Sequence, residues 1–312
     1  MKRFSLIVAI FLSTFSFANA QFVAKRYSVS GIDGIRAGWA FQIELEEGDS
    51  KEITIISPTQ TAEYVIVKNN NGILTLDLDF TNVTSKSNNP DGITQSGNTI
   101  MMSKNRKTLY GPIKVKMQIQ RLNAIILSGN AELTTKGSFK GEKITCHLTG
   151  NAKINNTKVA IETLSINATG TSNLSFSGSY KDVNIELGGN AQANIVGDYY
   201  KGDISEVGAS SLVLNGKTNS LNIDLSGSSA IELIGNSQNL HIESSGNSKA
   251  NCNNFNTRSA DLKLNGSSKI DMHILQSLNV KADGASQLNY TFRGDTSNLN
   301  IKKGISAIVK TM

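Results

Sequence analysis

The stretch Leu221-Asn-Ile-Asp-Leu-Ser-Gly-Ser-Ser-Ala-Ile-Glu-Leu233 decides the fold of this 312-residue chain. Apolar side chains occupy every second position on both sides of Gly227, which is typical of two short strands that each bury one face. Gly227 lies on the same parity as these apolar residues, and a residue without a side chain lets the backbone bend sharply. The pattern therefore predicts two strands that meet at a glycine corner.

The same corner recurs at intervals of 18–21 residues from residue 129 to the end of the chain. The predicted corner glycines are Gly129, Gly150, Gly170, Gly189, Gly208, Gly227, Gly246, Gly266 and Gly284, with Gly304-Ile-Ser306 as a degenerate last copy. Two strands cannot bury their own apolar face, but stacked copies form a continuous core. The sequence thus predicts an all-β chain in which residues 129–312 form a single-stranded parallel β-helix (a β-solenoid) of about ten repeats of 19–20 residues.

Each copy also has a regular inside and outside. With the corner glycine as position 0, even positions are mostly apolar and odd positions mostly polar, as solvated strand faces should be. A second turn is predicted near position +8, at Gly137, Gly178, Gly197, Gly216 and Gly235. Asparagine at position +1 in four copies (Asn130, Asn151, Asn190 and Asn247) either forms a ladder of side-chain hydrogen bonds or tolerates the turn geometry.

The N-terminus has the features of a cleaved signal peptide. Lys2 and Arg3 precede the apolar residues 6–12, and the segment ends in Ala18-Asn-Ala20. A transmembrane anchor is the alternative, but a span needs about 20 apolar residues and polar residues interrupt this stretch. We therefore expect residues 1–20 to be removed and the protein to be exported to the periplasm, the outer-membrane surface or the extracellular space, with no transmembrane segment.

Residues 21–128 alternate as strands but lack the glycine period. An exposed terminal repeat would present an unpaired strand edge to solvent, so this region is predicted to be a β-rich cap for the solenoid. Within it, residues 81–111 are polar and rich in Asn, Ser and Lys, which predicts a flexible loop or insertion.

Charge and cysteines exclude some classes of protein. The formal net charge of +6 falls to +4 when Lys2 and Arg3 are removed, and the remaining lysines are scattered, whereas nucleic-acid binding requires a clustered basic face. Cys146 and Cys252 fall several repeats apart, too far for a disulfide, so both are expected as unpaired thiols in the core.

No catalytic, cofactor-binding or metal-binding residues are predicted. Asn215-Gly-Lys-Thr218 resembles the end of a phosphate-binding loop, but the required first glycine is replaced by Ser211. The three histidines, His147, His241 and His273, fall in different repeats without a second ligand at zinc-binding spacing.

The enzymatic alternative is a carbohydrate-active β-helix, a polysaccharide lyase or glycosidase. Glu186, Asp224 and Glu243 share the outward column at position −3, with Asp224 and Glu243 on adjacent repeats about 5 Å apart. They are a conceivable acid pair, or ordinary polar residues on a solvated face. The repeat spacing leaves no room for the long substrate-binding loops of such enzymes, which favours the non-catalytic interpretation.

Several segments resemble the putative auto-transporter adhesin, head GIN domain family. They are Ser30-Gly-Ile-Asp-Gly-Ile35, Phe41-Gln-Ile-Glu-Leu-Glu-Glu-Gly-Asp49, Gly72-Ile-Leu-Thr-Leu-Asp77, Pro112-Ile-Lys-Val115, Leu122-Asn-Ala-Ile-Ile-Leu-Ser-Gly129 and the repeated pattern seen at residues 223–229. The resemblance implies an exported protein with a right-handed β-helical fold and a role in adhesion or cell-surface interaction. We therefore expect a non-catalytic binding module for glycans or for envelope or surface proteins, without a cofactor.

Overall fold

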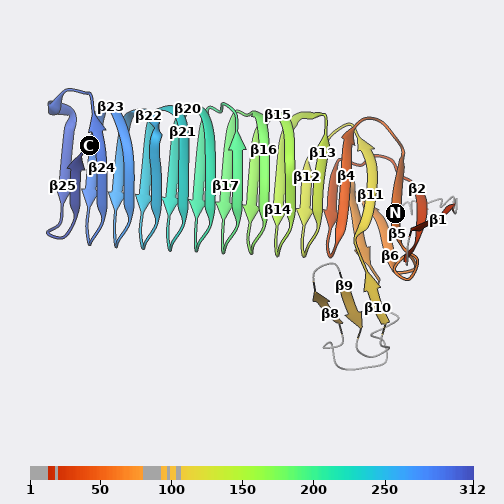
Figure 1. Cartoon of the computed structure of the whole chain (residues 1–312). Coiled ribbons are helices and arrows are strands. Elements are labelled where there is room, and N and C mark those ends of the chain that lie inside the picture. The colour runs from red at the N-terminus through yellow and green to blue at the C-terminus, as the bar shows by residue number, and fades with distance from the viewer. Residues whose placement is uncertain (1–12, 18–19, 80–92, 97–98, 103–106) are drawn as a thin grey trace. The chain divides into compact units, whose positions relative to one another are not determined.

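The computed structural model describes residues 13–17, 20–79, 93–96, 99–102 and 107–312, and most of them lie in β-strands (Figure 1). The predicted all-β solenoid of about ten turns is confirmed. The described chain holds no apolar helix that would reach across a bilayer. It divides into two compact units, residues 1–140 with 148–158 and residues 141–147 with 159–312. Of the predicted signal peptide, residues 1–12 and 18–19 lie outside the described residues.

The first unit contains three parallel turns of the coil, each called a rung. They are β3 (Gly34–Ala37) with β4 (Phe41–Glu47), β7 (Ile73–Leu78) with β11 (Ile113–Ile119), and β12 (Ala124–Leu127) with β13 (Glu132–Lys136). The rung that comes first in the sequence lies in the middle, because β3 pairs with both β7 and β12, and β4 pairs with both β11 and β13. The coil therefore begins at β3, well before the predicted boundary at residue 129.

Trp39 occupies the corner of this middle rung. The register of β3 and β12 aligns Ala37 with Leu127, which places Trp39 opposite Gly129. Trp39 has a φ of 53°, a conformation that glycine favours, and its indole Nε1 donates a hydrogen bond of 2.9 Å to Asp77. The glycine spacing does not predict this rung, because its corner residue is not glycine.

Antiparallel strands cover the outer edge of the first unit. β5 (Glu52–Pro58) pairs with β11, and β6 (Val65–Asn70) pairs with β7. β2 (Ala20–Ser28) continues the sheet beyond β5, and β1 (Ser13–Phe17) pairs with β2. The predicted β-rich cap is thus present, and it satisfies the backbone groups that an open parallel rung would leave unpaired.

The segment predicted as a loop, residues 81–111, contains regular structure in its described part. β8 (Ile93–Ser96), β9 (Thr99–Met102) and β10 (Lys107–Tyr110) form a small antiparallel sheet. The polar composition of the whole segment concealed these short strands, whose hairpin pairing depends on local partners rather than on a buried apolar face. Residues 81–92, 97–98 and 103–106 lie outside the described residues.

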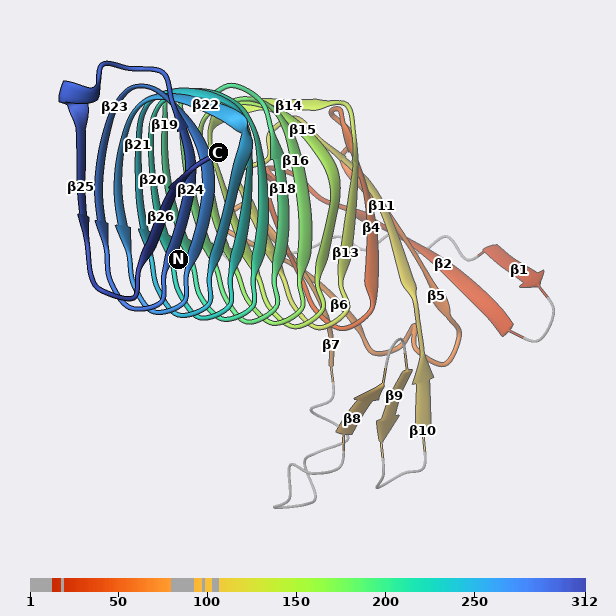
Figure 2. The ribbon, with the colours of Figure 1, turned by 60° about the vertical axis from the view of Figure 1, so that its left-hand side comes forward.

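The second unit is a continuous parallel stack, with neighbouring rungs side by side (Figures 1 and 2). Its strands are β16 (Asn173–Ser179), β17 (Asp182–Leu187), β18 (Gln192–Val196), β19 (Lys201–Glu206), β20 (Ser211–Leu225), β21 (Ala230–Ser244), β22 (Lys249–Leu264), β23 (Lys269–Ala282), β24 (Gln287–Phe292), β25 (Leu299–Lys303) and β26 (Ile308–Thr311). The 3₁₀ segment η1 (Thr296–Asn298) lies between β24 and β25. β14 (Ser138–Leu148) and β15 (Lys153–Ala168) contribute residues to both units.

The nine predicted corner glycines lie in tight turns between strands, with φ between +65° and +86°. In the turn around Gly189, the Ala191 N–H donates to the Gly188 carbonyl at 3.3 Å, which with positive φ at Gly189 alone defines a type II′ turn. The sequence pattern predicts that these glycines face the core, and this is wrong, because they are exposed or half-exposed. The alternation stops at the turn, and glycine is required there by its positive φ.

Consecutive corners also touch through their backbones. The Ser228 N–H donates a hydrogen bond of 2.6 Å to the carbonyl of Gly208 in the preceding rung, and the same bond recurs in other rungs. A Cβ on Gly246 would lie 2.6 Å from the carbonyl oxygen of Gly227. The corners therefore stack without space for a side chain.

The second turn lies inside the continuous strands β20 and β21 and at the strand ends in the two preceding rungs, and it is sterically stricter than the corner. A Cβ would lie 1.7 to 2.1 Å from a carbonyl oxygen of the preceding rung at each of four stacked glycines, Gly178, Gly197, Gly216 and Gly235. In the next rung, Phe255 of β22 lies opposite Gly235. That rung has one extra residue, and the pairing of β21 with β22 shifts by one between Glu232 and Ile234 to accommodate it. The glycine column ends where the rung length changes.

The last turn departs from the expected register. Leu288 aligns with Val309, which places Ile305 rather than Gly304 opposite the corner residue Gly284. Gly304 instead begins the turn, and the Ala307 N–H donates to its carbonyl at 3.3 Å. The prediction of Gly304 as the last corner is wrong because this copy is one residue longer than its glycine spacing suggests.

The core consists of the even-numbered positions, and the described residues at these positions are largely apolar and buried. Cys146 and Cys252 belong to it as free, buried thiols, as predicted, and burial raises the pKa of Cys252 to about 12. The inward serines at position +2, such as Ser229 and Ser286, are fully buried beside the corners.

Glu206 interrupts this apolar core, and the alternating pattern of the sequence does not predict a buried carboxyl group there. It lies in register between Leu187 and Leu225, and it is fully buried. One carboxyl oxygen accepts a hydrogen bond of 3.2 Å from Ser210, and the other has no hydrogen-bond partner in the described structure. Burial raises the pKa of Glu206 to about 8, because the core disfavours its charged form.

The stacked bend predicts a contrast between two glycines. We expect Gly216→Ala to lower the free energy of unfolding by about 3 kcal/mol or more, because its Cβ would lie 2.0 Å from the Gly197 carbonyl oxygen. Gly188→Ala is the control: its φ is not positive and its Cβ would lie 3.4 Å from the Thr169 methyl group, so it should be neutral or slightly stabilising. Urea unfolding measures both, and equal stability of the two variants would contradict the close stacking.

Glu206 predicts a pH dependence of stability. Its pKa rises from 4.5 in the unfolded chain to about 8 in the folded chain, so unfolding releases a proton between these pH values. The contribution of protonated Glu206 to the free energy of unfolding is complete below pH 4.5. It is lost as the pH rises to about 8, at about 1.4 kcal/mol per pH unit. Urea titrations from pH 5 to 8 should show this slope in the native chain and a flatter one in Glu206→Gln. An unchanged slope in the variant would refute the assignment.

Candidate functional site

The candidate surface lies on the strands that precede each corner in the second unit. We call it the ladder face and define it by the outward residues at positions −7, −5 and −3 of the rungs from β19 to β25, counted in the last rung from Ile305. Position −7 holds Lys201, Ser220, Asn239, Ser259, Ser277 and Asn298; position −5 holds Asp203, Asn222, His241, Asp261, Asn279 and Asn300; and position −3 holds Ser205, Asp224, Glu243, Lys263, Lys281 and Lys302.

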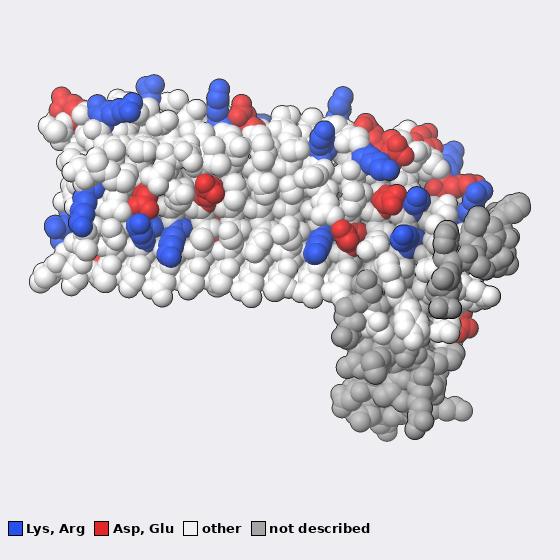
Figure 3. All heavy atoms as spheres, in the orientation of Figure 1, with Lys and Arg blue, Asp and Glu red and all other residues white. Residues whose placement is uncertain are grey.

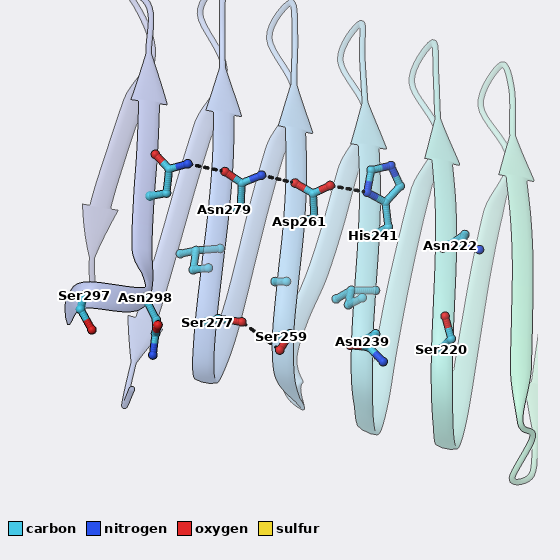
Figure 4. Close-up of a pocket in the computed structure, with 14 residues that line it drawn as sticks. Ser220, Asn222, Asn239, His241, Ser259, Asp261, Ser277, Asn279, Ser297 and Asn298 are labelled. Carbon is cyan, nitrogen blue, oxygen red and sulfur yellow. Dashed lines mark hydrogen bonds and ion pairs between the residues drawn. The ribbon is translucent and has the colours of Figure 1, made fainter. Parts of the chain in front are cut away.

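The side chains at position −5 form a hydrogen-bonded ladder across successive rungs (Figure 4). Asn300 Nδ2 donates to Asn279 Oδ1 at 2.9 Å, and Asn279 Nδ2 donates to Asp261 Oδ1 at 2.7 Å. The other oxygen of Asp261 lies 3.1 Å from His241 Nδ1. A separate pair continues the column, where Asn222 Nδ2 donates to Asp203 Oδ1 at 2.7 Å. Parallel in-register pairing brings these groups together because equivalent positions lie directly beside one another.

A shallow groove of about 490 Å³ runs over this part of the ladder face. Ser259 and Ser277 at position −7 line it, and the Ser277 hydroxyl donates to Ser259 at 2.8 Å (Figure 4). Their small side chains leave a hollow beside the longer side chains at position −5. Ser297 and Asn298, from η1, line the groove at the last rung.

Charges near the groove are paired with one another. His241 Nε2 lies 3.2 Å from Glu243 Oε1, and the Lys263 ammonium lies 2.6 Å from the same oxygen. The hydrogen bond from Lys263, followed by that from His241, lowers the pKa of Glu243 below its usual value. Acidic and basic residues are likewise few and interspersed over the rungs on the face shown in Figure 3. Opposite charges are thus paired around His241, whereas Lys263, Lys281 and Lys302 follow one another at position −3 toward the last rung.

The structure brings together only two of the three carboxylates in the predicted acid column. Asp224 and Glu243 lie opposite each other on adjacent rungs, whereas Ser205 separates Glu186 from Asp224. Glu186 accepts a hydrogen bond of 2.8 Å from Asn167. Because Glu243 is held ionised by Lys263, it is poorly suited to donate a proton as a general acid.

The three histidines lie apart, in the three strands β14, β21 and β23. His147 is exposed, His241 belongs to the ladder face, and His273 forms a hydrogen bond with Thr291. His241 thus has two carboxylate neighbours in space, which its sequence spacing did not reveal. Within the described ranges, no group of three His, Cys, Asp or Glu side chains is arranged to hold a metal ion.

Asparagine at position +1 forms a ladder only where two such residues adjoin. Asn151 Nδ2 donates to Asn130 Oδ1 at 3.1 Å in the first unit. The other two, Asn190 and Asn247, have Thr, Ala or Ser at the same position in the neighbouring rungs. Both interpretations of this column therefore apply, each to different copies.

The extended ladder at position −5 was not among the features predicted from the sequence. Counting five residues back from each corner glycine gives Asp203, Asn222, His241, Asp261 and Asn279 in consecutive repeats, so the sequence contains the signal for this column. Periodicity reveals such a column, but the hydrogen bonds depend on side-chain conformations that periodicity does not specify.

A second hollow, of about 300 Å³, lies in the first unit. Charged residues dominate its lining, among them Glu44 and Lys116, whose charged groups lie 3.5 Å apart. It is smaller than the groove and crosses three rungs, at β11, β4 and β13, together with the start of the antiparallel strand β5.

The family model of the putative auto-transporter adhesin, head GIN domain, matches residues 32–197 and 192–293. Among solved structures, the chain is similar to a putative adhesin from Parabacteroides merdae, with a TM-score of 0.50 and 14% identity over 93% of this chain and 96% of that chain. A putative adhesin from Parabacteroides distasonis has a TM-score of 0.48 and 14% identity over 94% and 98% of the two chains. A putative lipid binding protein from the same species has a TM-score of 0.46 and 13% identity over 93% and 96%.

At these identities the structural likeness concerns the fold alone. A comparison with curated proteins finds no match.

The ion pair of Glu243 with Lys263 predicts how the pKa of Glu243 responds to a substitution of Lys263. We expect Lys263→Met to raise the pKa of Glu243 toward its ordinary value, because the strongest hydrogen bond to its charged form is lost. The carboxyl ¹³C chemical shift followed against pH measures this change. Lys281→Met is the control, since the Lys281 ammonium lies 3.8 Å from Asp283 and belongs to another pair. An unchanged Glu243 titration in Lys263→Met would contradict the assignment.

Proposed function

The chain belongs to the putative auto-transporter adhesin, head GIN domain family, and from this we propose that it is an exported, non-catalytic binding module of the cell surface or envelope. Its ligands would be glycans or envelope or surface proteins. We propose no cofactor and no nucleic-acid partner.

The ladder face is the observation that carries this proposal. It presents hydroxyl, amide and carboxylate groups on consecutive rungs, and adjacent side chains hold one another in place by hydrogen bonds of 2.7 to 3.1 Å. Groups held in this way lose little conformational freedom when a ligand binds, which favours affinity. A regular polar surface on a stiff parallel stack suits recognition of an extended partner.

The export part of the proposal rests on the sequence. Residues 1–20 would form the signal peptide, residues 21–128 the cap strands together with the first rungs, and residues 129–312 the glycine-cornered repeats. The basic start, the apolar residues 6–12 and the Ala18-Asn-Ala20 ending support cleavage after Ala20. The destination would be the periplasm, the outer-membrane surface or the extracellular space.

The non-catalytic part rests on the state of the acid column. A glycosidase requires one carboxylic acid that can donate a proton, with its pKa raised. The Lys263 ammonium has the opposite effect on Glu243. No observation in the described structure favours the alternative, a polysaccharide lyase or glycosidase acting through Asp224 and Glu243.

Two assays on residues 21–312 test this proposal together. Binding to intact bacterial envelope fractions should be saturable, and release of reducing ends from pooled polysaccharides should stay at background. Pretreating the envelope with periodate destroys glycans, and pretreating it with protease destroys proteins, so the sensitive treatment identifies the ligand class. Absence of envelope binding would refute the binding role. Release of reducing ends that disappears in Asp224→Asn/Glu243→Gln would refute the non-catalytic role.

A further inference from the structure

We propose that the groove on the ladder face binds an extended, uncharged polysaccharide that lies across the rungs from β20 to β25. This inference rests on the proposed function and specifies its ligand and its site. The groove and the ladder occupy the same series of rungs, so the surface offers a shape and a set of hydrogen-bonding groups together.

The spacing of the rungs suits a polymer of sugars. Parallel strands repeat about every 4.8 Å, so position −5 presents one polar group per rung at that interval. A pyranose unit in an extended chain is about as long as one rung. Asn222, His241, Asp261, Asn279 and Asn300 would therefore face successive sugar units along the groove. A small molecule would use only part of a groove that crosses five rungs.

The ladder retains hydrogen-bonding capacity for a ligand. An asparagine amide has two N–H donors and an oxygen with two lone pairs. Within the ladder, Asn279 uses one N–H toward Asp261 and accepts one hydrogen bond from Asn300. The remaining donor and lone pair match the hydroxyl groups of a sugar, which both donate and accept. Ser220 and Asn239 add further groups of the same kind along position −7.

The charge of the groove favours an uncharged ligand. Asp261 and His241 are the titratable residues in its lining, and they are bonded to each other at 3.1 Å. The neighbouring Glu243 and Lys263 also form a pair, at 2.6 Å. A site for an acidic polysaccharide or a nucleic acid would present unpaired lysines or arginines that generate a positive field. This groove has no such concentration among its lining residues.

The lining also favours a glycan over a protein. The residues that dominate protein interfaces are Trp, Tyr and Arg, and they insert into desolvated pockets. None of these three types lines the groove. Its lining is mainly Ser and Asn, with Leu240, Ala260 and Leu278 beneath them. Binding would come from many weak hydrogen bonds along a polymer, which act together because the sites are rigidly linked.

The test compares two double variants of the full chain. Ser259→Leu/Ser277→Leu fills the groove and removes a hydrogen-bonded pair on adjacent rungs. Asn173→Leu/Gln192→Leu, at position +3 and outside the groove, is the control, because it also replaces a hydrogen-bonded polar pair on adjacent rungs with leucines; that hydrogen bond is 3.2 Å long. Asn279→Ala is a second groove variant, which adds no bulk and breaks the ladder. Circular dichroism and urea unfolding establish that each variant is folded.

Dextran, mannan, xylan and laminarin are the uncharged probes, and polygalacturonate is the charged one. We expect at least one uncharged probe to bind saturably, with little dependence on salt, and its Kd to rise at least tenfold in both groove variants but not in the control. Polygalacturonate should not compete.

Three outcomes would overturn the inference. The first is unchanged affinity for an uncharged probe in the groove variants, and the second is preferential, salt-sensitive binding of polygalacturonate. The third is absence of binding to every uncharged probe while envelope binding persists, which leaves the proposed binding role intact. If the native chain does not bind the envelope at all, the proposed function itself is refuted.

Discussion

The close contact of backbone with backbone at the two glycine columns is the constraint on which the structure depends. At the bend, a Cβ on Gly197 would lie 1.8 Å from the Gly178 carbonyl oxygen, and at the corners most turns donate a backbone hydrogen bond to the turn before them. These contacts hold successive rungs in the same register. In-register stacking then aligns equivalent side chains, so the core columns inside and the polar columns outside are consequences of one packing requirement.

Periodicity in the sequence was sufficient to predict the parallel coil, the apolar positions of its core and the turns at nine glycines, since these features repeat locally. It placed the glycines themselves on the buried face, whereas they are exposed or half-exposed. The first unit was harder to predict, because β3 and β4 pair with segments that are distant in sequence and the corner residue there is Trp39. The short strands β8 to β10 follow from hairpin pairing, and the polar composition of their surroundings obscured them. Gly304 was misplaced because a single extra residue shifts a turn without changing the apolar pattern.

For the polar surface too, the sequence predicts some features and not others. The repeat spacing predicts the column at position −3 and makes Asp224 and Glu243 neighbours within it. Their environment depends on neighbours across rungs: Lys263 binds Glu243, and Asp261 joins His241 to Asn279. Likewise, Glu206 stands in the sequence at an ordinary inward position, and only its neighbours Leu187 and Leu225 reveal how unusual a carboxyl group is there.

The order of the rungs in the first unit has a consequence for biosynthesis. The rung of β3 and β4 emerges from the ribosome before either of its parallel neighbours, β7 with β11 and β12 with β13. Its two edges stay open until residues far downstream have been made, whereas every later rung can add to a finished one as soon as it is synthesised. Folding from the N-terminus therefore has one slow, non-local step at its start, followed by growth in a single direction.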